Sequence, residues 1–241
     1  MNSLTGLRVA VTGGTSGLGL ALVRALSARG ARVAFVARGR ERVQRVAADC
    51  PGSHGIIGDV SLQNGIYPIA VQILGALGGL DVLINNASDL GPAALKRLGD
   101  TDCEEVERAL ATNLLGPFRL TKAVLGALSA SAREGRGALV VNVSSDAAIT
   151  PYPMWGAYAA SKAALRHMSA IWDAELDGQG VRVLSLDPGD MDTPLHAQAM
   201  PDADRASLKR PETAALEVIA AIEAAWPVAD GRTGTPAAVA R

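Results

Sequence analysis

The chain of 241 residues has few aromatic side chains, few cysteines and almost no net charge. Aromatic residues make up only 3% of the sequence and hydrophobic residues 49%, so the core has to be built mainly from Ala, Val, Leu and Ile. The formal net charge is −1, and the sequence contains no basic stripe or acidic block. This balance argues against nucleic acid and against an anionic membrane as partners.

Disulfide and metal chemistry also lack the necessary residues. Cys50 and Cys103 are the only cysteines, and neither has a second cysteine or a histidine at metal-ligand spacing. We therefore expect ordinary thiols in a reducing compartment and no metal site. No apolar run is long enough to span a bilayer, and a first strand from about Leu7 leaves no room for a cleaved signal peptide. The expectation is a cytoplasmic protein.

What the sequence does contain is a regular alternation of two kinds of segment. The short apolar, β-branched runs predict strands at Leu7–Thr12, Ala31–Ala37, Gly55–Gly58, Leu80–Asn85, Ala138–Val143 and Val181–Leu186. The longer segments, rich in Ala and Leu, predict helices at Gly17–Arg29, Arg40–Ala48, Leu62–Leu77, Asp102–Arg133 and Gly156–Asp177, and a last helix after Pro211. Continuous apolar runs are typical of parallel strands that helices cover on both faces. We expect one α/β domain over residues 1–241, with a doubly wound parallel sheet.

Residues capable of chemistry follow the predicted strands. In chain order they are Gly13, Asp59-Val60, Asn85-Asn86-Ala87, Ser144-Ser145 and Pro188-Gly189. The ligand crevice of an open α/β sheet lies along the carboxyl ends of its strands. The sequence therefore predicts one site at this edge.

Tyr158 and Lys162 stand four residues apart on a predicted helix, so they project from one face. A phenol with its ordinary pKa of about 10 is a poor proton-transfer group at neutral pH, and we expect the nearby ammonium to lower that pKa. The hydroxyl of Ser145 can hold a carbonyl oxygen beside the phenol. Taken alone, the pair also fits a half-buried aromatic with a solvated lysine.

The first predicted strand is followed by a glycine-rich loop. Gly13, Gly17 and Gly19 allow a tight turn and the close approach of a pyrophosphate. The amides at the start of the next helix favour the same anion.

These residues resemble the short-chain dehydrogenase/reductase family, in particular its short, single-domain NAD(P)-dependent branch. The resemblance runs from about Leu7 to Pro194 and rests on Thr12-Gly-Gly-Thr-Ser-Gly-Leu-Gly19, Asp59-Val60, Asn85-Asn86-Ala87, Asn113, Ser145, Tyr158, Lys162 and Pro188-Gly-Asp-Met-Asp-Thr193. It implies a Rossmann-type fold and interconversion of a carbonyl and an alcohol.

The resemblance also implies roles for individual residues. The catalytic set is Asn113, Ser145, Tyr158 and Lys162. The cofactor-binding set is Gly13, Thr15, Ser16, Gly17, Leu18, Gly19, Arg38, Asp59, Val60, Asn86, Ala87, Tyr158, Lys162, Pro188, Gly189, Met191 and Thr193. Asp59 resembles an aspartate that contacts adenine, although a turn residue is the alternative, and Asn85 and Ala87 resemble the segment under the ribose. Ser88 stands where the family usually has glycine.

The end of the second predicted strand indicates the cofactor. Enzymes that prefer NAD usually carry an acidic residue there for the ribose 2′-hydroxyl. This chain has Arg38 instead, which can pair with a 2′-phosphate. We therefore expect NADP(H). The alternative is that Arg38 and Arg40 only decorate a helix start.

Asn113 lies four residues before Pro117 in a predicted helix. Proline has no amide hydrogen, so residue 117 cannot donate to the carbonyl oxygen of Asn113. The resemblance implies that this oxygen holds a water that links Lys162 to solvent. An ordinary proline kink is the alternative.

Together these features predict an NADP(H)-dependent oxidoreductase acting on a small carbonyl compound or a primary or secondary alcohol. We expect residues 194–210 to form a substrate lid, residues 227–241 a loosely held tail, and the two longest helices to support a homodimer or homotetramer. Expected pocket walls are Ile149, Tyr152, Met154 and Trp155, with Leu195, His196, Met200 and Pro201 from the lid. A non-catalytic NADP(H)-binding regulator, or epimerisation or dehydration on the same fold, are the alternatives.

Overall fold

The computed structural model describes residues 4–226, so the expected tail at 227–241 lies outside the described residues. Six parallel strands form one sheet in the order β3-β2-β1-β4-β5-β6. Their bounds are β1 (Arg8–Thr12), β2 (Arg32–Ala37), β3 (Ser53–Ile57), β4 (Val82–Asn85), β5 (Ala138–Val143) and β6 (Val181–Leu186). The predicted doubly wound parallel sheet is confirmed. β3 and β4 each start two residues from their predicted bounds. β4 starts later, and β3 starts earlier because this edge strand begins with the polar Ser53 and His54 rather than with an apolar run.

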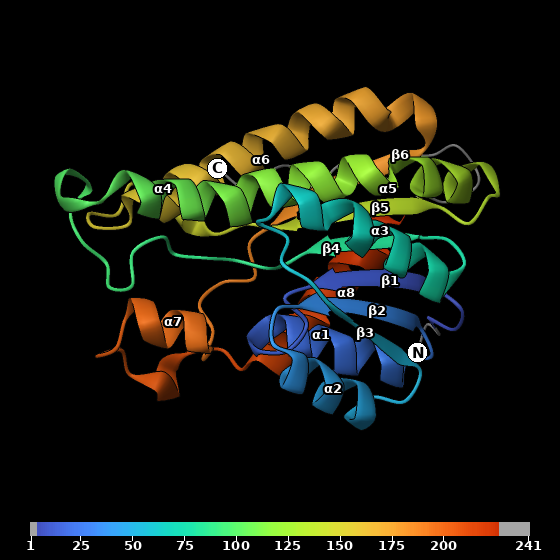
Figure 1. The fold of residues 1–241 in the computed structure, drawn as a ribbon, viewed down its shortest axis with the longest axis horizontal. Coiled ribbons are helices and arrows are strands. Elements are labelled where there is room, and N and C mark those ends of the chain that lie inside the picture. The colour runs from blue at the N-terminus through green and yellow to red at the C-terminus, as the bar shows by residue number, and fades with distance from the viewer. Residues whose placement is uncertain (1–3, 227–241) are drawn as a thin grey trace.

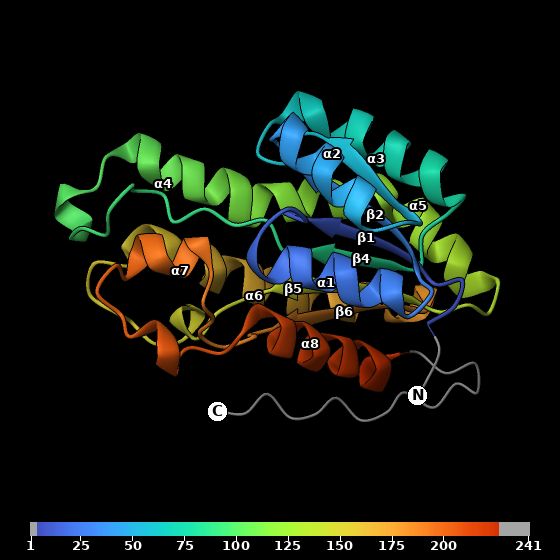
Figure 2. The same cartoon turned by 90° about the horizontal axis from the view of Figure 1, so that it is seen from below.

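Helices cover both faces of the sheet (Figure 1). Their bounds are α1 (Gly17–Ala28), α2 (Arg40–Asp49), α3 (Gln63–Leu77), α4 (Cys103–Leu110), α5 (Gly116–Arg133), α6 (Gly156–Leu176), α7 (Pro194–Ala199) and α8 (Pro211–Ala225). One core cluster joins α1, α2 and α8 to the sheet, and a second joins α3, α5 and α6 to its other face. Figure 2 shows α1 and α8 side by side on the first of these faces.

The two core clusters consist almost wholly of aliphatic side chains, as the composition predicts. Val9, Val11 and Ile84 are fully buried on one face of the sheet, and Ala10 and Leu83 on the other. Successive residues of a strand point to opposite faces, so a strand buried on both faces has to be apolar throughout. This is why the strands read as continuous apolar runs.

The predicted helix Asp102–Arg133 is interrupted. Residues 111–115 form a π-helical turn between α4 and α5, closed by a hydrogen bond from the Gly116 amide to the Ala111 carbonyl. Pro117 supplies no amide hydrogen at this point, which fits a local change in the hydrogen-bond register. The turn holds Asn113, whose side chain is buried.

At the amino edge of the sheet, a fully buried carboxylate ties three segments together. Asp81, directly before β4, accepts hydrogen bonds from the guanidinium of Arg8 at 2.6 Å and from that of Arg136 at 2.9 Å. The Ser131 hydroxyl of α5 donates to it at 2.6 Å. Burial opposes ionisation, but these donors outweigh it and hold the pKa of Asp81 well below its usual range.

At the opposite edge, β1 and β4 are neighbours although they are far apart in the chain, so the strand order reverses between them. A ligand crevice is expected at such a reversal. Helices α4 and α7 project beyond the sheet on one side, at the left in Figure 1. None of the helices within residues 4–226 is long and apolar enough to cross a membrane.

Candidate active site

The glycine-rich loop between β1 and α1 is packed too tightly for a side chain at Gly19. A Cβ atom there would lie 2.2 Å from the Gly13 carbonyl oxygen and 2.5 Å from the Asn86 amide nitrogen. Gly13 itself has a φ of +72°, a conformation that favours glycine. Helix α1 therefore starts directly against the loop, and its first amides, which no side chain caps, are available to an anion.

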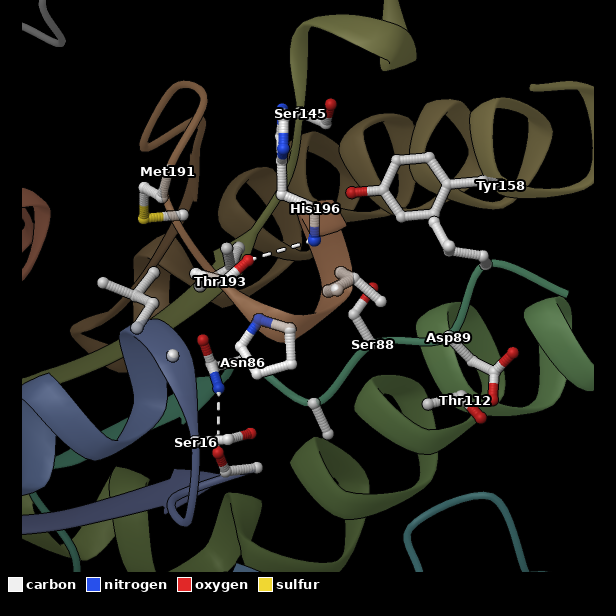
Figure 3. A pocket seen from close by; sticks show the side chains of 18 of the residues that line it. Ser16, Asn86, Ser88, Asp89, Thr112, Ser145, Tyr158, Met191, Thr193 and His196 are labelled. Atoms are coloured by element: carbon white, nitrogen blue, oxygen red, sulfur yellow. Dashed lines mark hydrogen bonds between the residues drawn. The ribbon is translucent and has the colours of Figure 1, made fainter. Parts of the chain in front are cut away.

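A pocket of about 850 Å³ runs along the carboxyl edge of the sheet (Figure 3). It is lined by every residue of the predicted catalytic and cofactor-binding sets except Gly19 and Asn113. Gly19 acts behind the lining by letting α1 approach, and Asn113 is buried beside it. The structure thus brings the dispersed motifs into one site, as the strand ends predict.

Thr12, the last residue of β1, holds the loop after β4 in place. Its hydroxyl accepts hydrogen bonds from the backbone amides of Asn86 and Ala87, both at 3.0 Å. The Asn86 side chain donates back to the Thr12 carbonyl at 2.8 Å. Asn85 precedes this loop and does not line the pocket. Its side chain turns into the core and donates to Asn142 at 2.8 Å.

Two arginines line one end of the pocket. Arg38 follows β2 as predicted, and Arg42, one turn later in α2, joins it. Within residues 4–226 neither side chain forms a hydrogen bond or an ion pair, so both cations are free to hold a ligand. The sequence prediction missed Arg42, although its spacing of four from Arg38 places it on the same side of a helix start. Arg40 does not line the pocket.

Asp59, after β3, is a turn residue that lies at the pocket wall, and its contact with adenine stays a prediction. Its carboxylate accepts hydrogen bonds from the Ser61 amide at 2.9 Å and the Ser61 hydroxyl at 2.7 Å, which makes it a turn residue. It also lines the pocket together with Val60. The turn holds these two residues at the pocket wall.

Tyr158 of α6 is buried in the pocket wall, and its hydroxyl points between Ser145 and Ser88 in Figure 3. Burial raises the pKa of Tyr158 to about 12, against hydrogen bonds with the Ser145 and Ser88 hydroxyls, which lower it. The expectation that the pKa of this phenol falls below its ordinary value because of Lys162 is therefore wrong for this structure. The cause is burial, which penalises the phenolate.

Lys162 lies one turn further along α6 and is buried. Its ammonium donates to the Val143 carbonyl at 2.7 Å and stands 5.6 Å from the centre of the Tyr158 ring. Burial lowers the pKa of Lys162 to about 8, although the Asp187 carboxylate opposes this shift. A lysine with this pKa can exchange protons near neutral pH.

Ser145 caps a short helical turn at the end of β5. Its hydroxyl accepts from the Ala147 amide at 3.2 Å and donates to the Asp146 carboxylate at 3.0 Å. Asp146 also accepts from the Tyr152 hydroxyl at 2.6 Å. These bonds fix the Ser145 side chain at the pocket wall beside Tyr158.

Asn113 uses its whole side-chain amide to join the loop after β4 to α6. Its oxygen accepts from the Ser88 hydroxyl at 3.1 Å and from the Asp89 amide at 2.9 Å. Its nitrogen donates to the Asp89 carbonyl and to the Ser161 hydroxyl, both at 2.8 Å. The side chain thus joins these two segments, and the water expected at the backbone carbonyl of Asn113 stays a prediction.

The segment 194–210 borders the pocket. Thr193 caps α7 by accepting from the His196 amide at 3.1 Å, and Gln198 donates to the Ala93 carbonyl at 3.1 Å in the loop after β4. Of the predicted walls, those that line the pocket are Tyr152, Trp155, Leu195, His196 and Met200. Ile149, Met154 and Pro201 do not, and they are exposed. Lining residues that the prediction missed include Asp89, Asp146, Asp187 and Gln198.

Comparison with known proteins agrees with this geometry. A family model described as short chain dehydrogenase matches residues 8–204. A short chain dehydrogenase of Pseudocercospora fijiensis is 34% identical over 200 residues, covering 80% of this chain but only 62% of that protein. The chain thus spans less than two thirds of this relative's length.

Two solved structures share the fold over most of both chains. A 3-ketoacyl-(acyl-carrier-protein) reductase of Brucella melitensis, complexed with NADH, has a TM-score of 0.84, with 25% identity over 91% of each chain. An alcohol dehydrogenase of the archaeon Thermococcus sibiricus, complexed with 5-hydroxy-NADP, has a TM-score of 0.81, with 27% identity over 94% of each chain.

Proposed function

The chain belongs to the short chain dehydrogenase family, and we propose that it is an NADP(H)-dependent oxidoreductase that interconverts a carbonyl compound and a primary or secondary alcohol. One observation carries this proposal. The hydroxyls of Tyr158 and Ser145 meet at one wall of the pocket, while the glycine loop forms another part of the same pocket. A proton donor, a hydrogen-bond donor for a carbonyl oxygen and a phosphate-binding loop are the parts that this reaction needs.

The residues of the pocket fit a dinucleotide phosphate. The loop at Gly13 and Gly17, with the uncapped start of α1, suits the pyrophosphate. Arg38 and Arg42 suit a 2′-phosphate, because neither cation is paired within residues 4–226 and the residue directly after β2 is Arg38 rather than an acidic residue. Asp59 and Val60 would contact the adenine. Lys162, Pro188, Gly189, Met191 and Thr193 would hold the nicotinamide half.

When bound, the cofactor supplies or accepts the hydride. The chain supplies the proton and the field around the reacting oxygen. Ser145, whose one hydroxyl proton goes to Asp146 in this structure, would turn that proton to the substrate oxygen. Tyr158, with its pKa raised to about 12 by burial, holds its proton at neutral pH and gives it to the alkoxide that forms during reduction. Lys162 lies on the pocket face of α6, one turn from Tyr158, and can return a proton to Tyr158 from the interior, since burial lowers its pKa to about 8.

The wider expectations remain proposals. They are a single domain over residues 1–241, a lid formed by residues 194–210, a homodimer or homotetramer and a cytoplasmic location. The exposed Phe118 of α5 and Ile171 of α6 support assembly through the longest helices. The Gln198 bond to the loop after β4 supports the lid.

The test is the loss of NADPH absorbance with aliphatic, aromatic and β-keto carbonyl compounds, repeated with NADH. We expect turnover that favours NADPH and that falls at least about 10³-fold in Tyr158→Phe, because the proton donor is removed with little change of shape. Tyr67→Phe makes the same change at an exposed site on α3 and should leave turnover unaltered. NADPH binding without turnover in the parent would favour the regulator, and full activity of Tyr158→Phe would refute the mechanism.

A further inference from the structure

We propose that Ser88 is a positioning residue whose hydroxyl stabilises the phenolate of Tyr158 after this tyrosine has given up its proton. Its catalytic consequence rests on the proposed function, but its effect on Tyr158 does not. Ser88 lies in the loop directly after β4 and lines the pocket. Figure 3 shows it on the side of the Tyr158 hydroxyl opposite Ser145.

A hydrogen bond to a buried side chain fixes the position of the Ser88 hydroxyl. It donates to the Asn113 side-chain oxygen at 3.1 Å, and Asn113 in turn donates to Ser161 at 2.8 Å. The Ser161 hydroxyl donates to the backbone carbonyl of Tyr158 at 2.6 Å. Ser88 and Tyr158 are therefore held by one chain of hydrogen bonds. The Ser88 hydroxyl lies beside the phenol in Figure 3 and lowers its pKa.

A serine hydroxyl carries one proton and two acceptor positions, so it can serve both states of the phenol. While Tyr158 is neutral, the Ser88 hydroxyl donates a hydrogen bond to Asn113 and can accept one from the phenolic O–H group. When the phenolic O–H bond breaks and its proton passes to the substrate oxygen, the Ser88 proton can turn to the phenolate without leaving its own oxygen. The side-chain oxygen of Asn113 keeps a hydrogen bond when this happens, because the Asp89 amide still donates to it at 2.9 Å.

The other charged groups near the phenol do not replace this donor. Lys162 on α6 donates to Val143 and faces the ring, 5.6 Å from its centre. Asp146 after β5 and Asp187 after β6 both disfavour the phenolate. Asp89 and His196 also line the pocket, from the loop after β4 and from α7. Ser145 and Ser88 are the two hydroxyls that favour the charged phenol, and Ser145 is needed for the substrate.

The experiment follows the ionisation of Tyr158 directly. The three tyrosines are replaced by a ring-fluorinated tyrosine, which is more acidic, and titrated by ¹⁹F NMR. Tyr67→Phe and Tyr152→Phe assign the signals. We expect Ser88→Ala to raise the pKa of Tyr158 by about one unit, because a hydrogen bond to the charged form is lost, and Ser88→Thr to restore it. The signal of Tyr152 should not move.

An unchanged Tyr158 titration in Ser88→Ala, or an equal shift in Ser88→Thr, would overturn the proposal. Ser88→Gly, with the residue usual in the family, provides a second removal of the hydroxyl if the alanine variant folds poorly. In carbonyl reduction we expect about a tenfold lower kcat for Ser88→Ala with a smaller change in KM. Because the titration needs no substrate, it decides the role of Ser88 even if the proposed reaction fails its own test.

Discussion

The two edges of the sheet differ in how far their polar groups are paired. At the amino edge, the Asp81 carboxylate is fully paired with Arg8, Arg136 and Ser131. At the carboxyl edge, Arg38 and Arg42 form no pair within residues 4–226. Ser144, which lines the pocket, has a buried hydroxyl with no hydrogen-bond partner in the same range. At the amino edge the polar groups bind one another and hold the strands together. At the carboxyl edge they are available to a ligand.

The same contrast appears in the pKa values. Asp81 is buried, yet its donors hold its pKa well below the usual range, so it stays charged. Tyr158 and Lys162 are buried with fewer partners, and burial favours their neutral forms, with pKa values of about 12 and about 8. A charge that stays fixed suits structure, whereas a proton that can be moved suits chemistry. Changes at the two edges should therefore have separable effects.

The largest effect on stability is expected at the amino edge. Asp81→Asn leaves Arg8 and Arg136 without their carboxylate, and we expect the free energy of unfolding at pH 7 to fall by about 3 kcal/mol. Turnover per folded molecule should not change. Because the folded-state pKa of Asp81 is depressed, its contribution is present above pH 3.8 and lost as the pH falls further. Chemical denaturation at several pH values measures both effects.

Glu134→Gln is the matched control, because Glu134 is exposed and lies 3.8 Å from Arg8 at the rim of the same cluster. It should change stability by less than about 0.5 kcal/mol. Equal losses of unfolding free energy in the two variants would show that the buried ion pairs of Asp81 stabilise the fold no more than the exposed pair of Glu134.

The next effect concerns Lys162 at the carboxyl edge. Its folded-state pKa of about 8 lies below the ordinary 10.5, so the folded chain releases this proton first and stability should rise with pH between these values. Between pH 8 and pH 10, the free energy of unfolding of Lys162→Met should rise by about 2 kcal/mol less than that of the parent. The raised pKa of Tyr158 acts only above pH 10, outside this window. Lys122→Met on α5 is the exposed control, and an unchanged slope in Lys162→Met would contradict the assignment.

The smallest effect concerns cofactor selection. Arg38→Ala should weaken NADPH binding about tenfold and leave NADH binding unchanged, because one partner of the 2′-phosphate is lost. Arg42 lines the same end of the pocket and limits the loss. Arg40→Ala, next to this end but outside the lining, should affect neither cofactor. Isothermal titration with both cofactors checks this, and an equal loss for NADPH and NADH would refute the phosphate role of Arg38.

Much of this arrangement could be predicted from sequence because it follows from local rules. Parallel strands place their carboxyl ends at one edge, so the motifs after β1, β3, β4, β5 and β6 had to meet. The glycine pattern also predicts a tight turn, and the lack of space for a Cβ atom at Gly19 agrees with it. These features depend on chain direction and on the lack of a side chain, and both can be read from the sequence.

The rest depends on packing between distant segments. The sequence gives no measure of burial, so the direction of the Tyr158 pKa was predicted wrongly. Asp81 stands 50 or more residues from Ser131 and Arg136, and nothing local marks their contact. Ser88 and Asn113 meet only because a π-helical turn faces the loop after β4. Such contacts require the folded structure.

The comparison of the two edges is tested most directly by measuring Tyr158→Phe and Asp81→Asn together. For each variant, NADPH-dependent turnover per folded molecule and the free energy of unfolding are determined under the same conditions. We expect Tyr158→Phe to lose at least about 10³-fold in turnover with stability within about 1 kcal/mol of the parent, and Asp81→Asn to show the reverse. Undiminished turnover in Tyr158→Phe, or equal losses of turnover in both variants, would contradict the assignment of proton transfer to the carboxyl edge.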